Sequence, residues 1–270
     1  MPQSIETLTI EAMARRRRSR RIGLVIQALI ALLVLWSLEA IVVGDTDWTR
    51  VSLASVGRAL GRFAAFDWRL VPDLLEPALE TVVMATLATL LGLVLAIPVA
   101  WLGAGNISPF GRVSYGIGRA LMTLSRSIHE IVWGLVFVAA VGLGALAGIL
   151  AMSLRSIGFI SKMVAEAIED VDTGPIDAVR AAGADRFQIL MYAIVPQVLP
   201  VVLGSIIFEW DVNVRRSTIM GLVGAGGLGL ALHRQITAYN YGGIVAVILT
   251  ILGIILIGEV SSTHARKAVI

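Results

Sequence analysis

Long apolar stretches separated by short polar segments are the dominant pattern along this chain. The first covers residues 22–43 and contains only three polar side chains, Gln27, Ser37 and Glu39. Later apolar stretches occupy residues 80–102, 120–162, 198–223 and 243–260. Gly-rich residues 142–148 interrupt the longest of them, which predicts a turn there. Because about 20 apolar residues are needed for a helix to cross a bilayer, the pattern predicts an all-α integral membrane protein with about six transmembrane helices.

The composition supports this class and excludes several others. Hydrophobic residues make up 57% of the chain and charged residues 15%, with a mean hydropathy of +0.86. Soluble domains rarely combine these values. The sequence contains no cysteine, which excludes disulfides, thiolate metal sites and cysteine nucleophiles. A formal net charge of +3 is too small to indicate nucleic acid, so the lipid membrane is the expected environment.

A basic cluster precedes the first apolar stretch. It contains six arginines, namely Arg15, Arg16, Arg17, Arg18, Arg20 and Arg21. A secretory signal peptide also starts with positive charge, but its apolar core is shorter and ends at a small-residue cleavage site. Residues 22–43 are therefore predicted to be a retained transmembrane helix. The positive-inside rule places residues 1–21 in the cytoplasm.

Residues 44–78 are too polar to span a membrane and are expected outside the cell. Aromatic and apolar side chains alternate there with arginines; the set is Phe63, Phe66, Trp68 and Leu70 with Arg58, Arg62 and Arg69. This mixture is typical of an amphipathic helix on the membrane surface. An ordered external loop explains the same residues, and both interpretations stay open.

The distribution of basic residues gives the orientation of the predicted spans. Thirteen of the 22 lysines and arginines fall on segments predicted to be cytoplasmic, five on external segments and four within spans. This asymmetry places both termini in the cytoplasm. Residues 79–270 then form a core of five transmembrane helices, and the polar loop at residues 174–196 also faces the cytoplasm.

That loop is predicted to contain two short helices joined by a hinge. Pro175 suits a first helical position, and Asp177 places negative charge in the first turn. Gly183 can adopt the left-handed conformation that ends a helix, and Asp185 can cap the next one. Small residues such as Ala178 allow another protein to approach the backbone closely.

The loop resembles the coupling loop of ABC-importer permeases, which docks on the ATPase subunit in that family. The matching residues are Asp177, Ala178, Val179, Gly183, Ile194, Val195 and Pro196. The resemblance implies a type I ABC-importer permease of MetI-like architecture. It also implies that ATPase coupling rests on Asp177, Ala178, Gly183, Ala184, Asp185 and Arg186.

Charged residues also lie inside the apolar stretch at 198–223. At 100° per residue, Glu209, Asn213 and Arg216 share one helix face, whereas Asp211 and Arg215 lie on the opposite face. Ionisable groups inside a membrane are costly and usually mark a functional site. A helix with two polar faces must be packed on both sides, for instance between its own bundle and a second protomer.

The same region resembles the phosphonate (PhnE-type) branch of these permeases. The matching residues are Trp210, Asp211, Asn213, Arg215, Thr218, Gly221, Gly224, Gly226 and Gly227. The resemblance implies a permease subunit that moves phosphonate, phosphate or phosphite by alternating access. We expect the substrate path or gate to include Arg215, Asn213, Asp211, Glu209, Arg216, Arg126 and Glu130.

The guanidinium group suits such cargo because its planar fork of donors matches two oxygens of a tetrahedral oxyanion. Arg215 has two possible roles, contact with the passing anion or an ion pair with Asp211, and the sequence does not decide between them. The glycines at 221–229 follow no nucleotide fingerprint and are expected to form tight turns near the external gate.

A third polar group lies near the cytoplasmic end of the third predicted span. Arg126, His129 and Glu130 are spaced i, i+3 and i+4, so Arg126 and Glu130 can pair. His129 and Glu130 resemble the start of a zinc-protease helix, but Trp133 stands where the second histidine ligand is required. We therefore expect no metal site, no catalytic residues and no cofactor bound by this chain.

The resemblance also implies the partners. These are a second copy of the chain, a cytoplasmic dimer of ATP-binding subunits that uses ATP and magnesium, and an extracytoplasmic phosphonate-binding protein. The expected location is the inner (plasma) membrane of a bacterial cell. Two alternatives stay open: the same type of permease for another small solute, such as an amino acid or betaine, and an ion-coupled secondary transporter.

Overall fold

A computed structural model describes residues 5–44 and 52–269 of the chain. It divides into two compact units, Met1–Leu60 and Gly61–Ile270. The first unit contains α1 (Ile5–Leu38), a π-helical turn (Glu39–Gly44) and most of α2 (Leu53–Arg62).

Helix α1 joins the expected basic segment and the first expected span into one continuous helix. The side chains of Arg15–Arg18 and Arg21 lie outside the described part of the structure. From Ile22 to Val42 the helix is long and apolar enough to cross a membrane, and no residue of its most apolar window is buried. A helix that is apolar on all sides is suited to lipid on all sides.

Helix α2 is shorter than the amphipathic helix expected from the aromatic residues. Ser52 and Ser55 exchange hydrogen bonds between side chain and backbone at the start of α2, and the helix ends at Arg62. Phe66 and Leu70 lie beyond this end, where they pack against the cluster around Leu74. These apolar residues belong to the core of the second unit and do not extend the face of α2.

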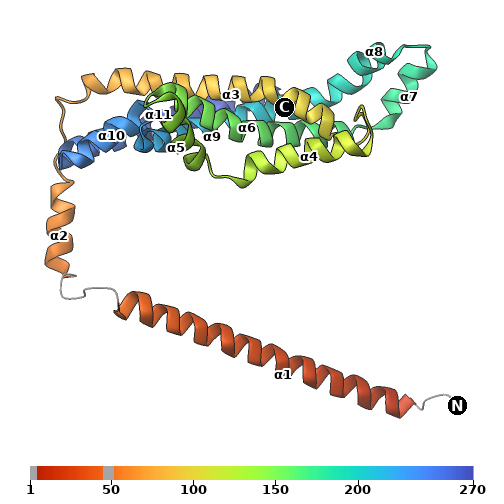
Figure 1. The fold of residues 1–270 in the computed structure, drawn as a ribbon, viewed down its shortest axis with the longest axis horizontal. Coiled ribbons are helices and arrows are strands. Elements are labelled where there is room, and N and C mark those ends of the chain that lie inside the picture. Colours follow the sequence, from red (N-terminus) through yellow and green to blue (C-terminus); the bar gives the residue numbers. More distant parts are fainter. Residues whose placement is uncertain (1–4, 45–51, 270) are drawn as a thin grey trace. The chain divides into compact units, whose positions relative to one another are not determined.

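The second unit is a helical bundle. Its helices are α3 (Leu75–Gly103), α4 (Arg112–Ser127), α5 (Glu130–Val141), α6 (Ala145–Glu169), α7 (Thr173–Ala181), α8 (Arg186–Ile189), α9 (Val195–Met220), α10 (Gly227–Thr237) and α11 (Tyr241–Val269). Shorter 3-10 or π-helical turns occupy Pro72–Leu74, Leu190–Ile194 and Gly221–Val223. Helices α3, α6 and α9 pack on one another, while α7 and α8 project from one end of the bundle and α10 lies at the other (Figure 1).

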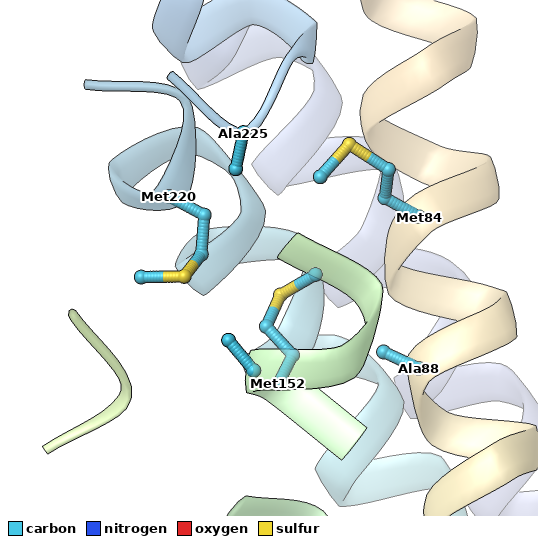
Figure 2. Close-up of a cluster of buried hydrophobic side chains, with 6 residues drawn as sticks. Met84, Ala88, Met152, Met220 and Ala225 are labelled. Carbon is cyan, nitrogen blue, oxygen red and sulfur yellow. The ribbon is translucent and has the colours of Figure 1, made fainter. Parts of the chain in front are cut away.

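Methionine and alanine side chains form a core cluster between these long helices. Figure 2 shows the cluster, whose buried members are Met84, Ala88, Ala151, Met152, Met220 and Ala225. Alanine lets the backbones approach closely, and the flexible methionine side chain fills the irregular space that remains. The cluster therefore joins α3, α6 and the end of α9 with little room for rearrangement.

The third expected span is broken. Helices α4 and α5 meet at an angle of 87°, and the break lies at Ile128 and His129. The His129 ring accepts a hydrogen bond from the Ile131 amide and so caps α5. The expected turn at residues 142–148 is shorter, because α6 already begins at Ala145.

Among the described residues, five helices are long and apolar enough to cross a membrane, or six if the bent pair α4–α5 forms one span. The five are Ile22–Val42, Pro72–Gly103, Ala145–Glu169, Phe187–Val223 and Tyr241–Lys267. The expected fold class, an all-α integral membrane protein with about six spans, is therefore confirmed.

Two glycines in α4 allow a direct test of how closely α3 and α4 pack. A Cβ atom at Gly118 would lie 2.4 Å from the backbone nitrogen of Gly103 in α3, whereas a Cβ at Gly116 would meet nothing within 4 Å. We expect Gly118→Ala to destabilise the fold by about 1–3 kcal/mol through overpacking. Gly116→Ala should leave stability unchanged or raise it by up to about 1 kcal/mol. Thermal unfolding of both purified variants measures this, and equal midpoints would contradict the close α3–α4 approach.

Candidate functional site

Three polar side chains of α9 lie on one face of the helix, as their spacing predicts. The Arg216 Nη1 donates to Glu209 Oε1 at 2.7 Å and to Asn213 Oδ1 at 3.3 Å. The Glu209 side chain is only 1% exposed and that of Arg216 16%. This face of α9 therefore points into the bundle, where the arginine and the carboxylate neutralise each other.

Helices α3 and α6 supply the remaining hydrogen-bond partners. Ser156 in α6 donates to Glu209 Oε1 at 2.8 Å, and Asn213 donates to Ser156 Oγ and to Thr89 Oγ1 of α3, each at 2.9 Å. Ser156 lies next to the midpoint of α6. The other Glu209 oxygen, Oε2, is buried without a hydrogen-bond partner among the described residues. These contacts place charged groups near the middle of the bundle, far from either end.

Glu130, at the start of α5, extends this group of charges. Its Oε1 lies 3.4 Å from Arg216 Nε, and its Oε2 lies 3.8 Å from Nε of Arg155 in α6. The Arg155 Nη1 also donates to the Arg126 carbonyl at 2.7 Å. We call this set the central charge network; its members are Glu130, Arg155, Ser156, Glu209, Asn213 and Arg216.

Glu130 contacts Arg155 and Arg216 and not Arg126, although the sequence spacing allows a pair with Arg126. An i,i+4 pair requires a continuous helix, but the chain breaks at Ile128 and His129 between the two residues. Glu130 turns inward and is buried, whereas Arg126 is exposed. Arg155 joins the site from another helix, and no local spacing in the sequence connects it to Glu130.

The opposite face of α9 carries a second group of charges. Arg215 Nη2 lies 2.6 Å from Asp211 Oδ2 and also pairs with Glu259 of α11. We call these three residues the α9–α11 charge cluster. The Arg215 and Glu259 side chains are 43% and 50% exposed on the isolated chain. Because charge facing lipid is costly, this side of the bundle needs a polar or protein neighbour inside a membrane.

Residues 221–226 form the tight turns that the glycines predict, and the last glycines of this stretch begin α10. Gly224 and Gly226 have positive φ angles of 89° and 90°. The Gly227 amide, at the start of α10, donates to Glu80 Oε2 at 2.8 Å, and the next amide donates to Thr81 Oγ1 at 2.9 Å. Side chains of α3 therefore satisfy the first amides of α10, the groups that an anion would otherwise bind.

The polar loop contains two short helices, α7 and α8, as the sequence predicts. Helix α7 begins at Thr173 and not at Pro175, because Asp172 Oδ1 accepts a hydrogen bond from the Gly174 amide and caps the helix. Asp177 and Arg180 form an exposed pair at 2.8 Å. The loop therefore presents charged side chains to its surroundings.

The junction of α7 and α8 matches the predicted hinge. Gly183 has a φ of 85° at the end of α7. Asp185 and Gln188 exchange hydrogen bonds between side chain and backbone at 2.8 and 2.9 Å, which caps α8. Ala178 is exposed and Ala184 half-buried, and the side chain of Arg186 lies outside the described part of the structure. In the described residues no cluster of three or more metal-ligating side chains is found.

Residues 88–269 match the family described as binding-protein-dependent transport system inner membrane component. The chain is 38% identical to the phosphite transport system permease protein PtxC of Stutzerimonas stutzeri, over 83% of this chain and 82% of that protein. It is 43% identical to the phosphate-import permease protein PhnE of Mycolicibacterium smegmatis, over 66% of this chain and 34% of that protein.

A solved structure has a similar fold. The inward-facing MetNI methionine ABC transporter matches 76% of this chain and 100% of its own chain, with a TM-score of 0.64 and 25% identity. This likeness supports the MetI-like arrangement of the core helices.

A double-mutant cycle on Glu209 and Arg216 tests whether the two residues form a coupled buried pair. We expect Arg216→Gln to lower stability by about 3–5 kcal/mol, because it leaves the buried Glu209 without a counter-charge. Glu209→Gln should cost less, because Glu130 still lies beside Arg216. The loss of stability in the double variant should be smaller than the sum of the two single losses by about 0.5–3 kcal/mol. Unfolding midpoints of the purified variants give these values. Lys162→Gln, in an exposed pair with Glu166, serves as the control and should cost less than about 1 kcal/mol.

Proposed function

The chain belongs to the family of binding-protein-dependent transport system inner membrane components, and from this premise we propose that it is the permease subunit of an ATP-driven oxyanion importer. Its cargo is phosphite or phosphate, the substrates named in the relatives that it resembles at 38% and 43% identity, or a phosphonate, as the sequence resemblance implies. The chain is a translocation subunit and performs no reaction of its own.

The observation that carries this proposal is the central charge network. It places Arg155 and Arg216 near the middle of the bundle, where a passing solute has no bulk water to stabilise its charge. Guanidinium groups bind oxyanions through paired, charge-assisted hydrogen bonds. The glutamates of the network compete for the same donors, which keeps contact with the cargo short-lived. An importer requires this, since tight binding would stop release.

The projecting loop α7–α8 provides the contact with an ATPase. It protrudes at one end of the bundle, and its exposed charges and left-handed glycine suit a protein–protein contact. A π-helical turn, Leu190–Ile194, joins α8 to α9 without a loop. Displacement of α7–α8 by a closing ATPase dimer therefore moves α9, which bears residues of both charge groups. This rigid coupling is the physical basis of alternating access.

The other end of the bundle and one of its sides are assigned to the remaining partners. A substrate-binding protein delivers cargo at the α10 end, opposite the ATPase. A second copy of the chain covers the α9–α11 charge cluster, so that Arg215 and Glu259 face protein or a water-filled path and not lipid. The complex lies in the inner membrane of a bacterium, with both termini and α7–α8 in the cytoplasm.

Uptake by cells tests the substrate. We expect a bacterium without other phosphorus importers to accumulate phosphite, a phosphonate or phosphate from the medium when it expresses this chain with its ATPase and binding protein. Arg216→Gln should reduce uptake by about tenfold or more, because a charge-assisted hydrogen bond is lost. Arg58→Gln, on α2, is the matched control. If the chain instead imports methionine and Arg216→Gln leaves that uptake unchanged, the chain is a permease of this type for another solute. If uptake continues without any ATPase, the chain is a secondary transporter.

Substitutions at Gly183 test the coupling role of the loop. Asparagine tolerates the left-handed conformation and valine does not. We therefore expect Gly183→Asn to retain most uptake and Gly183→Val to reduce it severely, with little change in the stability of the bundle. ATP hydrolysis stimulated by loaded binding protein should fall in parallel. Equal activity of the two variants would contradict a conformational role for this residue.

A further inference from the structure

The two buried glutamates of the central charge network are held very differently. Glu209 Oε1 accepts short hydrogen bonds, at 2.7 Å from Arg216 and 2.8 Å from Ser156. The Glu130 carboxylate accepts no side-chain hydrogen bond from the described residues, although its side chain is only 11% exposed. Burial without hydrogen bonds is costly for a carboxylate. Glu130 is therefore a poor fit for the place that it occupies.

Three groups from three elements converge on this carboxylate. Arg216 Nε of α9 lies at 3.4 Å, His129 Nδ1 before α5 at 3.7 Å and Arg155 Nε of α6 at 3.8 Å. All three distances exceed those of charge-assisted hydrogen bonds, which are about 2.7–2.9 Å. His129 Nδ1 already accepts from the Ile131 amide, so only the two guanidinium groups remain as donors, and both lie too far from the carboxylate for a charge-assisted hydrogen bond.

Other contacts keep the two arginines in place. Arg216 Nη1 is fixed by Glu209 and Asn213, and Arg155 Nη1 by the Arg126 carbonyl at the α4–α5 break. The Nε atoms of both arginines remain directed at Glu130. The donors are therefore positioned before any ligand arrives, which lowers the entropic cost of binding.

We propose that the oxyanion cargo binds between Arg155 and Arg216 and takes the place of the Glu130 carboxylate. A tetrahedral phosphite, phosphonate or phosphate group presents oxygens in more directions than a carboxylate, so it can accept from both Nε edges at once. Glu130 is the resident counter-ion that keeps the arginines neutralised when no cargo is present. This inference rests on the proposed function, because it assigns the cargo to a particular pair of residues.

The surroundings of Arg155 and Arg216 provide a route by which the cargo can replace the Glu130 carboxylate. His129 is 63% exposed and Arg155 28%, so the pair is open on the side of the α4–α5 break, whereas Glu209 and Asn213 close it on the inner side. Glu130 is the first residue of α5, and its side chain can leave toward this open side. Glu209 stays paired with Arg216 during the exchange and holds that arginine in position.

Direct binding of inorganic phosphate and phosphite to the purified full chain, together with its ATPase, tests the proposal. We expect Glu130→Gln to bind both anions about tenfold tighter than the unchanged protein, because the competing charge is gone. Arg155→Gln should bind them about tenfold more weakly or worse, through loss of a charge-assisted hydrogen bond. Arg58→Gln should bind as the unchanged protein does.

A conservative variant distinguishes loss of anion binding from loss of folding. Arg155→Lys retains the positive charge but loses the planar fork, so we expect a weaker but measurable affinity and a normal unfolding midpoint. The proposal is overturned if Arg155→Gln and Arg155→Lys bind as tightly as the unchanged protein, if Glu130→Gln binds no tighter, or if Arg215→Gln alone abolishes binding. Failure to detect binding in both the unchanged protein and Glu130→Gln overturns it as well.

Uptake measurements separate this inference from the proposed function. If cells still import phosphite or phosphate and the Glu130 and Arg155 variants leave affinity unchanged, only the assignment of the site is wrong. If the unchanged protein imports none of these anions, the proposed function itself is wrong.

Discussion

The structure depends on one interaction, the contact of Arg216 with two glutamates inside the bundle. Glu209 belongs to the same helix, but Glu130 begins α5, so the arginine ties two helices together. Removing a charge from water costs several kcal/mol, and only a well-placed counter-charge repays it. The positions of α5 and α9 are therefore linked, because separating them leaves a charge buried without a partner.

Close helix packing makes this interaction possible. A Cβ atom at Gly92 of α3 would lie 2.7 Å from Ser156 Cβ, and one at Gly158 would lie 2.6 Å from Ser125 Oγ. Glycine at these crossings lets α3, α4 and α6 approach until short side chains can reach the charges. Ser156 and Thr89 then complete the hydrogen bonds of Glu209 and Asn213. A larger residue at either crossing would separate the polar groups from their partners.

The break between α4 and α5 sets the character of the proposed site. It turns Glu130 away from Arg126 and toward the bundle, and it exposes a backbone carbonyl that orients Arg155. The same break leaves His129 at the surface. One interruption of a helix thus turns a carboxylate into the bundle and orients one of the two arginines beside it. Under the proposed function, this is where the motion of the helices and the path of the cargo meet.

The sequence alone determined what depends on neighbours along the chain. Apolar length gave the spans, and helical spacing placed Glu209, Asn213 and Arg216 on one face, because both follow from the geometry of a single helix. Only the tertiary structure decided which helices meet. It paired Arg215 with Glu259, 44 residues away, and Glu130 with Arg155. Such contacts depend on how helices cross and where they bend. Neither the crossings nor the bends can be derived from a local pattern of residues.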